Sequence, residues 1–111
     1  MHPSFITAPT EESLGVSLPA GAIYSTELTA FYSGYSTQGD PRFVFEIESD
    51  LVSVERFFEE QTGRRAIPSP DTELVAKLPL AGNDYVMLQG SRDSSSVMII
   101  ICKPRDAPRP R

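Results

Sequence analysis

Hydrophobic and polar residues alternate in two stretches of the first half of the chain, and alternation is typical of a strand with one buried face. Every second residue over 22–32 is apolar or a residue common in strands, which predicts a first strand there. The polar segment 33–41 contains two glycines and ends it. The clearest alternation follows at 42–48, where three apolar side chains share one side, and it predicts a second strand.

The hydrophobic period changes to that of an amphipathic helix after Asp50. Leu51, Val54 and Phe58 recur at spacings of three and four residues, while charged side chains occupy the opposite side. Ser49 and Asp50 each offer a side-chain oxygen that can cap the first turn, and Gly63 offers the left-handed conformation that ends a helix. This pattern predicts a short helix between Asp50 and Gly63 whose apolar side packs on a sheet.

Three more strands are predicted in the second half of the chain, over 73–78, 85–89 and 97–102. The last of these is apolar on both sides, which is typical of a central strand. Residues 64–71 contain two prolines and are predicted to form a connection. The resulting order is β-β-α-β-β-β. We therefore predict an α+β fold with an antiparallel sheet of about five strands and one helix on one face.

Proline and charge divide the 111-residue chain into three parts. Three of the ten prolines lie in 1–21 and three in 103–111, so we predict a flexible N-terminal arm with Pro and Ser, a single domain over 22–102 and a basic, Pro-rich tail. The formal net charge is −5, but residues 1–102 hold six Lys and Arg against fourteen Asp and Glu, a balance of −8. The folded part is therefore more acidic than the whole chain.

One helix covers one face of a sheet, so the other face needs a different cover. The apolar side chains on that other face would form a patch, and a large apolar patch is rarely left in water on a soluble monomer. The N-terminal arm, a second copy of the chain or a different protein could cover it. The candidate interaction surface joins this face to an aromatic segment at the end of the first strand: Phe31, Tyr32, Tyr35, Val44, Leu88, Met98 and Ile100. The aromatic residues also fit an alternative in which they end the first strand in the core.

Side chains that usually carry catalysis are scarce. His2 is the only histidine and lies in the predicted arm, so the domain lacks the base that a nucleophilic Ser or Cys requires. Cys102 is the only cysteine, which excludes an internal disulfide and a Cys/His metal site, and we interpret it as a small core residue. Glu46 and Glu48 are interpreted as the solvated side of a strand. We predict no catalytic residue, no metal and no cofactor.

Partners and location are constrained by charge and hydropathy. The acidic body would repel the phosphates that the basic tail attracts, so nucleic acid is not an expected partner. No apolar run approaches the ~20 residues of a membrane span. The first residues lack the pattern of a secretory signal, which indicates a cytoplasmic protein. A bacterial periplasmic or envelope location is the alternative if a signal or lipid-anchor segment has been removed.

Three functions fit these observations. We favour a non-catalytic protein-binding or accessory module. An inhibitor or immunity-type partner for a basic toxin or enzyme is one form of it, because complementary charge speeds association. The first alternative is a structural domain that associates with a second copy through the uncovered face. The second alternative is a small enzyme or ligand carrier that works with carboxylates and tyrosines.

Overall fold

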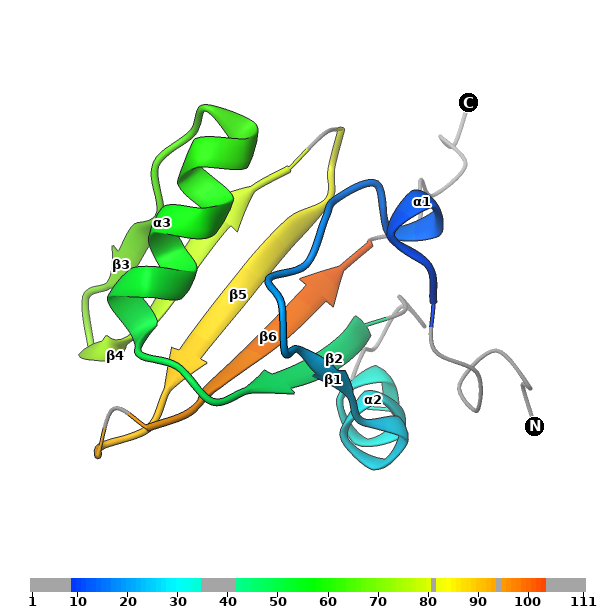
Figure 1. Cartoon of the computed structure of the whole chain (residues 1–111), viewed down its shortest axis with the longest axis horizontal. Coiled ribbons are helices and arrows are strands. Elements are labelled where there is room, and N and C mark those ends of the chain that lie inside the picture. Colours follow the sequence, from blue (N-terminus) through cyan, green and yellow to red (C-terminus); the bar gives the residue numbers. More distant parts are fainter. Residues whose placement is uncertain (1–8, 35–41, 81, 94, 104–111) are drawn as a thin grey trace, which may run out of the picture.

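The computed structural model describes residues 9–34, 42–80, 82–93 and 95–103 (Figure 1). Its elements are, in chain order, α1 (Glu11–Leu14), β1 (Ile23–Tyr24), α2 (Thr26–Gly34), β2 (Arg42–Ile47), α3 (Leu51–Thr62), β3 (Ile67–Ser69), β4 (Thr72–Pro79), β5 (Tyr85–Gly90) and β6 (Val97–Cys102). All described strands form one antiparallel sheet in the order β1-β2-β6-β5-β4-β3. The predicted α+β class with a helix on an antiparallel sheet is confirmed, and the sheet has six strands rather than about five.

Helix α3 begins and ends where its capping residues stand. The Asp50 carboxylate accepts hydrogen bonds from the backbone N–H of Ser53 at 3.1 Å and from its hydroxyl at 2.7 Å. Gly63 ends the helix in the left-handed conformation, with φ of 71°, and its N–H donates to the carbonyl of Glu59 at 2.8 Å. The predicted helix is therefore confirmed, with Asp50 rather than Ser49 as its N-cap and Gly63 at its end.

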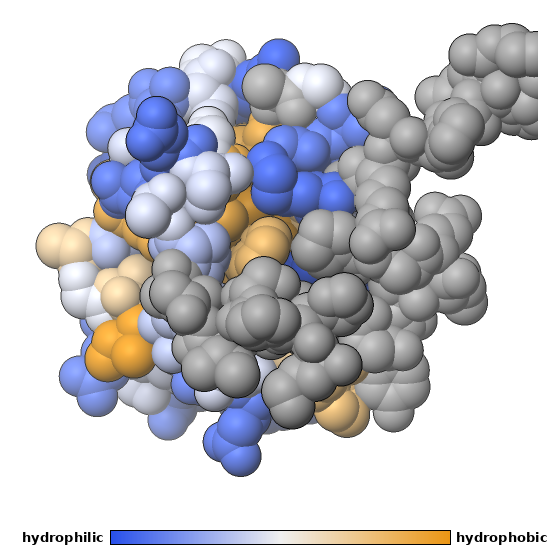
Figure 2. All heavy atoms as spheres, turned by 90° about the vertical axis from the view of Figure 1, so that its right-hand side faces the viewer, coloured by the Kyte–Doolittle hydropathy of each residue, from blue (hydrophilic) through white to orange (hydrophobic). Residues whose placement is uncertain are grey.

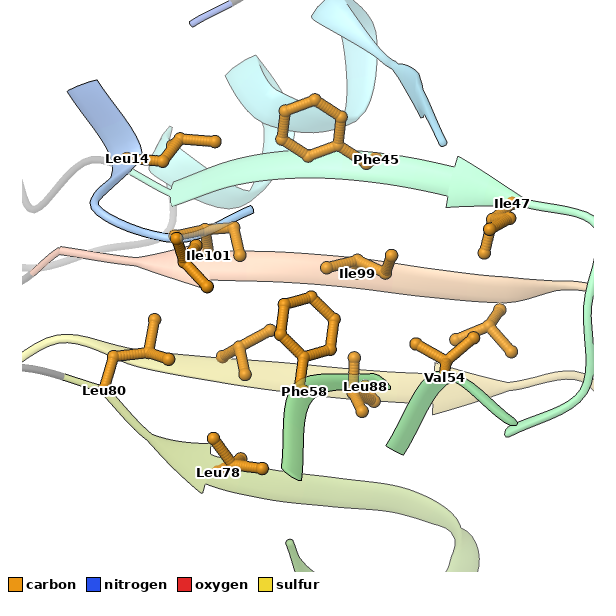
Figure 3. Packing of buried hydrophobic residues seen from close by; sticks show 13 residues of the cluster. Leu14, Phe45, Ile47, Val54, Phe58, Leu78, Leu80, Leu88, Ile99 and Ile101 are labelled. Carbon is orange, nitrogen blue, oxygen red and sulfur yellow. The ribbon is translucent and has the colours of Figure 1, made fainter. Parts of the chain in front are cut away.

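The main core lies between α3 and one face of the sheet, which we call the main face. Helix α3 crosses β4 and β5 (Figure 1), and Val54 and Phe58 are its buried side chains. Figure 3 shows both residues beside Leu88 and Ile99 of the sheet. The complete cluster of buried residues in this core is Leu14, Val16, Phe45, Ile47, Val54, Phe58, Leu78, Leu80, Val86, Leu88, Val97, Ile99 and Ile101.

The segment from α1 to β1 covers the rest of the main face. Leu14 and Val16 are only 1% and 5% exposed and belong to the main core. The segment is also held to α3, because the side chain of Gln61 accepts from the N–H of Ser17 at 2.6 Å and donates to its carbonyl at 3.1 Å. Residues 9–21 are therefore part of the folded unit. The sequence pattern predicted that this unit begins at residue 22. Residues 1–8 of the predicted arm lie outside the described residues.

The prediction of a single strand over 22–32 is wrong, because β1 has two residues and α2 follows it. The Ser25 hydroxyl accepts from the N–H of Leu28 at 3.2 Å, and the Ser25 carbonyl accepts from the N–H of Thr29 at 3.0 Å, so Ser25 caps the helix. Leu28 and Tyr32 are four residues apart and share one side of a helix. The same spacing also satisfies an alternating pattern, so these positions fit both a strand and a helix.

The predicted strands over 73–78, 85–89 and 97–102 are confirmed as β4, β5 and β6. Strand β3 lies in the segment predicted as a connection and forms the edge of the sheet next to β4. The end of β6 is tied to the rest of the core by Lys103. Its ammonium lies 2.6 Å from the carboxylate of Asp84 and donates to the carbonyl of Leu14 at 3.2 Å. Residues 104–111 of the predicted tail lie outside the described residues.

Candidate protein-binding surface

The second face of the sheet, opposite the main face, is covered by α2 over β2 and β6. Val44, Ile100 and Cys102 are buried there, and Leu28 and Tyr32 of α2 pack against them. Thr29 attaches the helix to the strand, since its buried hydroxyl accepts from the N–H of Val44 at 2.9 Å. One half of the second face is therefore a small closed core, which we call the second cluster. The interpretation of Cys102 as a small core residue is confirmed.

The predicted interaction surface is largely buried within the chain. Val44 and Ile100 are covered by α2, and Met98 is half-buried beside them. Leu88 is fully buried in the main core, because it is paired with Ile99 and faces α3 rather than the second face. The prediction of an open surface is therefore wrong for Val44, Leu88 and Ile100, which are buried.

The aromatic residues of that prediction divide into three cases. Phe31 is 53% exposed on α2, whereas Tyr32 is half-buried against the second cluster. Their rings meet edge to face, with centroids 5.3 Å apart. Tyr35 lies outside the described residues. On the side of the molecule that carries α1 and α2, the described hydrophobic residues form separate groups among hydrophilic ones (Figure 2).

The other half of the second face is an apolar surface that the described helices do not cover. Strand pairing places Ile67, Lys77 and Met87 in one cross-strand row, which continues beneath α2 through Ile100 and Val44. A hollow of about 280 Å³ lies here, and Ile67 is 61% exposed. The residues that line the hollow are Ile67, Pro68, Ser69, Pro70, Val75, Ala76, Lys77 and Met87. We call this surface the β3–β5 patch.

Sequence reasoning missed the β3–β5 patch because residues 64–71 were interpreted as a connection. Proline is tolerated in an edge strand, where its missing N–H would face solvent. Ile67 precedes two prolines, and a β-branched residue in such a segment is a usable signal for an edge strand. Of the residues predicted for the uncovered face, Leu88 faces the main core, and the part of the second face that the described helices leave open lies over β3, β4 and β5.

Lys77 is the only charged side chain among the described residues that line the hollow. Its ammonium lies 4.3 Å from the centroid of the Tyr85 ring, a cation–π contact. Among its described lining residues, the patch therefore combines aliphatic side chains with one positive charge, in a chain whose formal net charge is −5.

A larger hollow of about 550 Å³ lies at the other end of the sheet. Glu46 and Glu48 line it together with Ile23, which is 70% exposed. Both glutamates are exposed, as the alternating pattern predicted. Across the described ranges, the structure brings together no group of three or more His, Cys, Asp and Glu side chains that could hold a metal ion.

The loop between β5 and β6 is organised around Asp93. Its carboxylate accepts hydrogen bonds from the hydroxyls of Ser91 and Ser95 and from the N–H of Ser95. These bonds favour the ionised form and lower the pKa of Asp93 to about 2. These hydrogen bonds lie within the loop itself, between Asp93, Ser91 and Ser95.

Neither hydropathy nor similarity adds a functional assignment. Among the helices in the described part of the chain, none combines the length and hydrophobicity needed to cross a membrane. A scan against protein-family models, a search of curated proteins and a search of solved structures found no match. The function must therefore be inferred from the surface itself.

Proposed function

We propose that this chain is a non-catalytic protein-binding module whose partner binds on the β3–β5 patch. The observation that supports this most directly is the division of the second face into two halves. The half under α2 packs as a core around Val44 and Ile100, while the same cross-strand row continues through Met87 and Lys77 to Ile67, which is 61% exposed. Apolar side chains that continue from a core onto an open surface, here on both sides of Lys77, are typical of an interaction site.

The size and chemistry of the hollow favour a protein partner over a small ligand. Its volume of about 280 Å³ lies just below the ~300–1,000 Å³ of small-molecule sites. Among the described lining residues, Lys77 is the one titratable group, and none of the others could form an acid–base pair with it. Aliphatic side chains without such a pair bind by burying surface.

The acidic hollow beside Ile23 supports a second candidate, an inhibitor-type module for a basic protein. Glu46 and Glu48 would meet the cations of such a partner, and the charge balance of −8 over residues 1–102 would speed association. Salt separates the two candidates. Binding through the β3–β5 patch should change little with ionic strength, whereas binding through the acidic hollow should weaken strongly as salt rises.

Two matched variants test the proposal. Ile67 in the patch and Val52 on α3 are exposed to nearly the same extent, 61% and 59%, so Ile67→Asp and Val52→Asp impose similar changes at two sites. The native protein and both variants are used to capture partners from the host organism at low and high salt. The captured protein is then purified and its affinity measured. We expect Ile67→Asp to abolish binding and Val52→Asp to preserve it, at both salt concentrations.

Other results would count against the proposal. Equal binding by the two variants would show that the patch is not the binding site. Loss of binding at high salt alone, with Ile67→Asp still active, would favour the acidic hollow. Light scattering addresses the self-association alternative, because a dimer that Ile67→Asp dissociates would identify the partner as a second copy of the chain.

A further inference from the structure

We propose that the partner presents a single amphipathic helix to the β3–β5 patch, with apolar side chains on Ile67 and Met87 and a carboxylate beside Lys77. This inference rests on the proposed function and specifies the chemistry of the partner. It follows from the width of the open surface, the nature of the sheet edge and the charge of Lys77.

The open part of the second face has the width of one helix. Adjacent strands lie ~4.8 Å apart, and neighbouring packed helices lie ~8–10 Å apart. Helix α2 lies mainly over β2, and its Leu28 and Tyr32 pack against the cluster that Val44 of β2 forms with Ile100 and Cys102 of β6. A second helix beside it, two strand spacings away, would lie over β5 and β4. Strand β5 has six residues, a length of ~20 Å, which matches a helix of ~13 residues.

The edge of the sheet disfavours a partner that adds a strand. Strand β3 has three residues, and its central residue is Pro68, which has no N–H to donate. The pairing with β4 shifts between Pro68 and Ser69, and Pro70 follows the strand. Prolines and irregular pairing at an edge are features that block the addition of further strands. The partner therefore packs on the face of the sheet through side chains.

Lys77 defines the charge that the partner must supply. Covering the patch would remove the ammonium from water, and an unpaired buried cation is strongly unfavourable. The Tyr85 ring compensates for part of this cost through the cation–π contact. A carboxylate at the margin of the partner helix would complete the pair, since no acidic side chain is among the described residues that line the hollow.

The same charge argues against a second copy of the chain. Lys77 stands between Ile67 and Met87 in the cross-strand row, so a two-fold axis through the centre of the patch would bring two Lys77 side chains together. Helices α3 and α2 are also already packed on the sheet, α3 through Val54 and Phe58 in the main core and α2 through Leu28 and Tyr32 in the second cluster. A different protein with an exposed amphipathic helix fits the patch better.

Two phage-displayed libraries test this inference on the full chain. One randomises the surface of a single helix in a monomeric helical scaffold, and the other displays linear peptides. Both are selected on the native protein, with soluble Ile67→Asp protein present to remove binders that do not need the patch. Val52→Asp is the matched control, and thermal unfolding establishes that every variant is folded. Lys77→Glu tests the charge pairing, and Lys77→Gln is used in its place if the Lys77→Glu protein does not fold.

We expect binders from the helix library with apolar residues at i, i+3 or i+4, and i+7, and with Asp or Glu enriched next to that stripe. Lys77→Glu should weaken them at least about tenfold, and changing the selected acidic residue to Lys should restore binding to that variant. Val52→Asp should bind as the native protein does.

The alternative outcomes overturn the inference in distinguishable ways. Patch-dependent binders from the linear library alone would exclude a helix and leave the proposed function standing. Helical binders without acidic residues, or unaffected by Lys77→Glu, would exclude the carboxylate pairing. A dimer of the native chain that Ile67→Asp dissociates would make a second copy the occupant. Failure of both libraries to give any binder sensitive to Ile67→Asp would contradict the inference. A native partner whose binding is unchanged by Ile67→Asp would contradict the proposed function itself.

Discussion

Thr29 is the residue on which the division of the second face depends. It is fully buried, and its hydroxyl accepts the hydrogen bond of the Val44 N–H at 2.9 Å. Thr29→Val keeps the shape of the side chain and removes the acceptor, which leaves a buried N–H without a partner. That change should cost about 1–3 kcal/mol of stability. In a domain of this size, each kcal/mol lowers the melting temperature by ~4–8 °C.

Thr29→Ser is the control, because it keeps the acceptor and removes one methyl group, worth about 0.8 kcal/mol. Urea unfolding of both variants gives the two free energies, and amide hydrogen exchange reports on Val44 directly. We expect Thr29→Val to be the less stable variant and to accelerate exchange of the Val44 amide. A Thr29→Val protein as stable as the native one, or more stable than Thr29→Ser, would refute the role of this bond in holding α2 on the sheet.

Three further predictions concern other parts of the fold. Leu14→Ala should lower the unfolding free energy by about 2–5 kcal/mol in urea, because Leu14 is buried in the main core; a change under ~0.5 kcal/mol would show that the N-terminal segment lies outside it. Lys103→Met should cost about 1 kcal/mol and be non-additive with Asp84→Ala in a double-mutant cycle, since the two side chains form an ion pair; additive effects would contradict the pairing. The pKa of Asp93 is lowered from 3.8 to about 2 in the folded protein, so its stabilising contribution is complete above the unfolded pKa and is lost as pH falls toward 2. The free energy of unfolding should therefore depend less on acid pH in Asp93→Asn than in the native protein. Identical pH profiles of the two proteins would contradict a stabilising role of the Asp93 carboxylate.

The parts of the fold that were predictable are those where independent local signals agree. Helix α3 has an apolar period, an Asp50 cap and a Gly63 stop, and all three place it at the same residues. Strand β6 is apolar on both sides, and it lies in the centre of the sheet with two covered faces. In α2 the local pattern was ambiguous, because Leu28 and Tyr32 fit both periods.

The candidate surface was harder to predict because it depends on strand register. The alternation within β5 shows that Leu88 and Met87 face opposite sides, but it does not show which side is which. Pairing of Leu88 with Ile99, rather than with Ile100, turns Leu88 into the main core and Met87 onto the second face. Register of this kind is set by contacts between distant segments, and a shift of one residue reverses every side chain.

Cross-linking from the patch tests the central claim most directly. A photoreactive amino acid replaces Ile67 in one protein and Val52 in another, and both are irradiated in the host organism. If the β3–β5 patch is the docking surface, we expect the probe at position 67 to form a covalent adduct with one protein other than this chain. The probe at position 52 should form none. The absence of an adduct from position 67, or the same adducts from both positions, would contradict a docking surface on this face of the sheet.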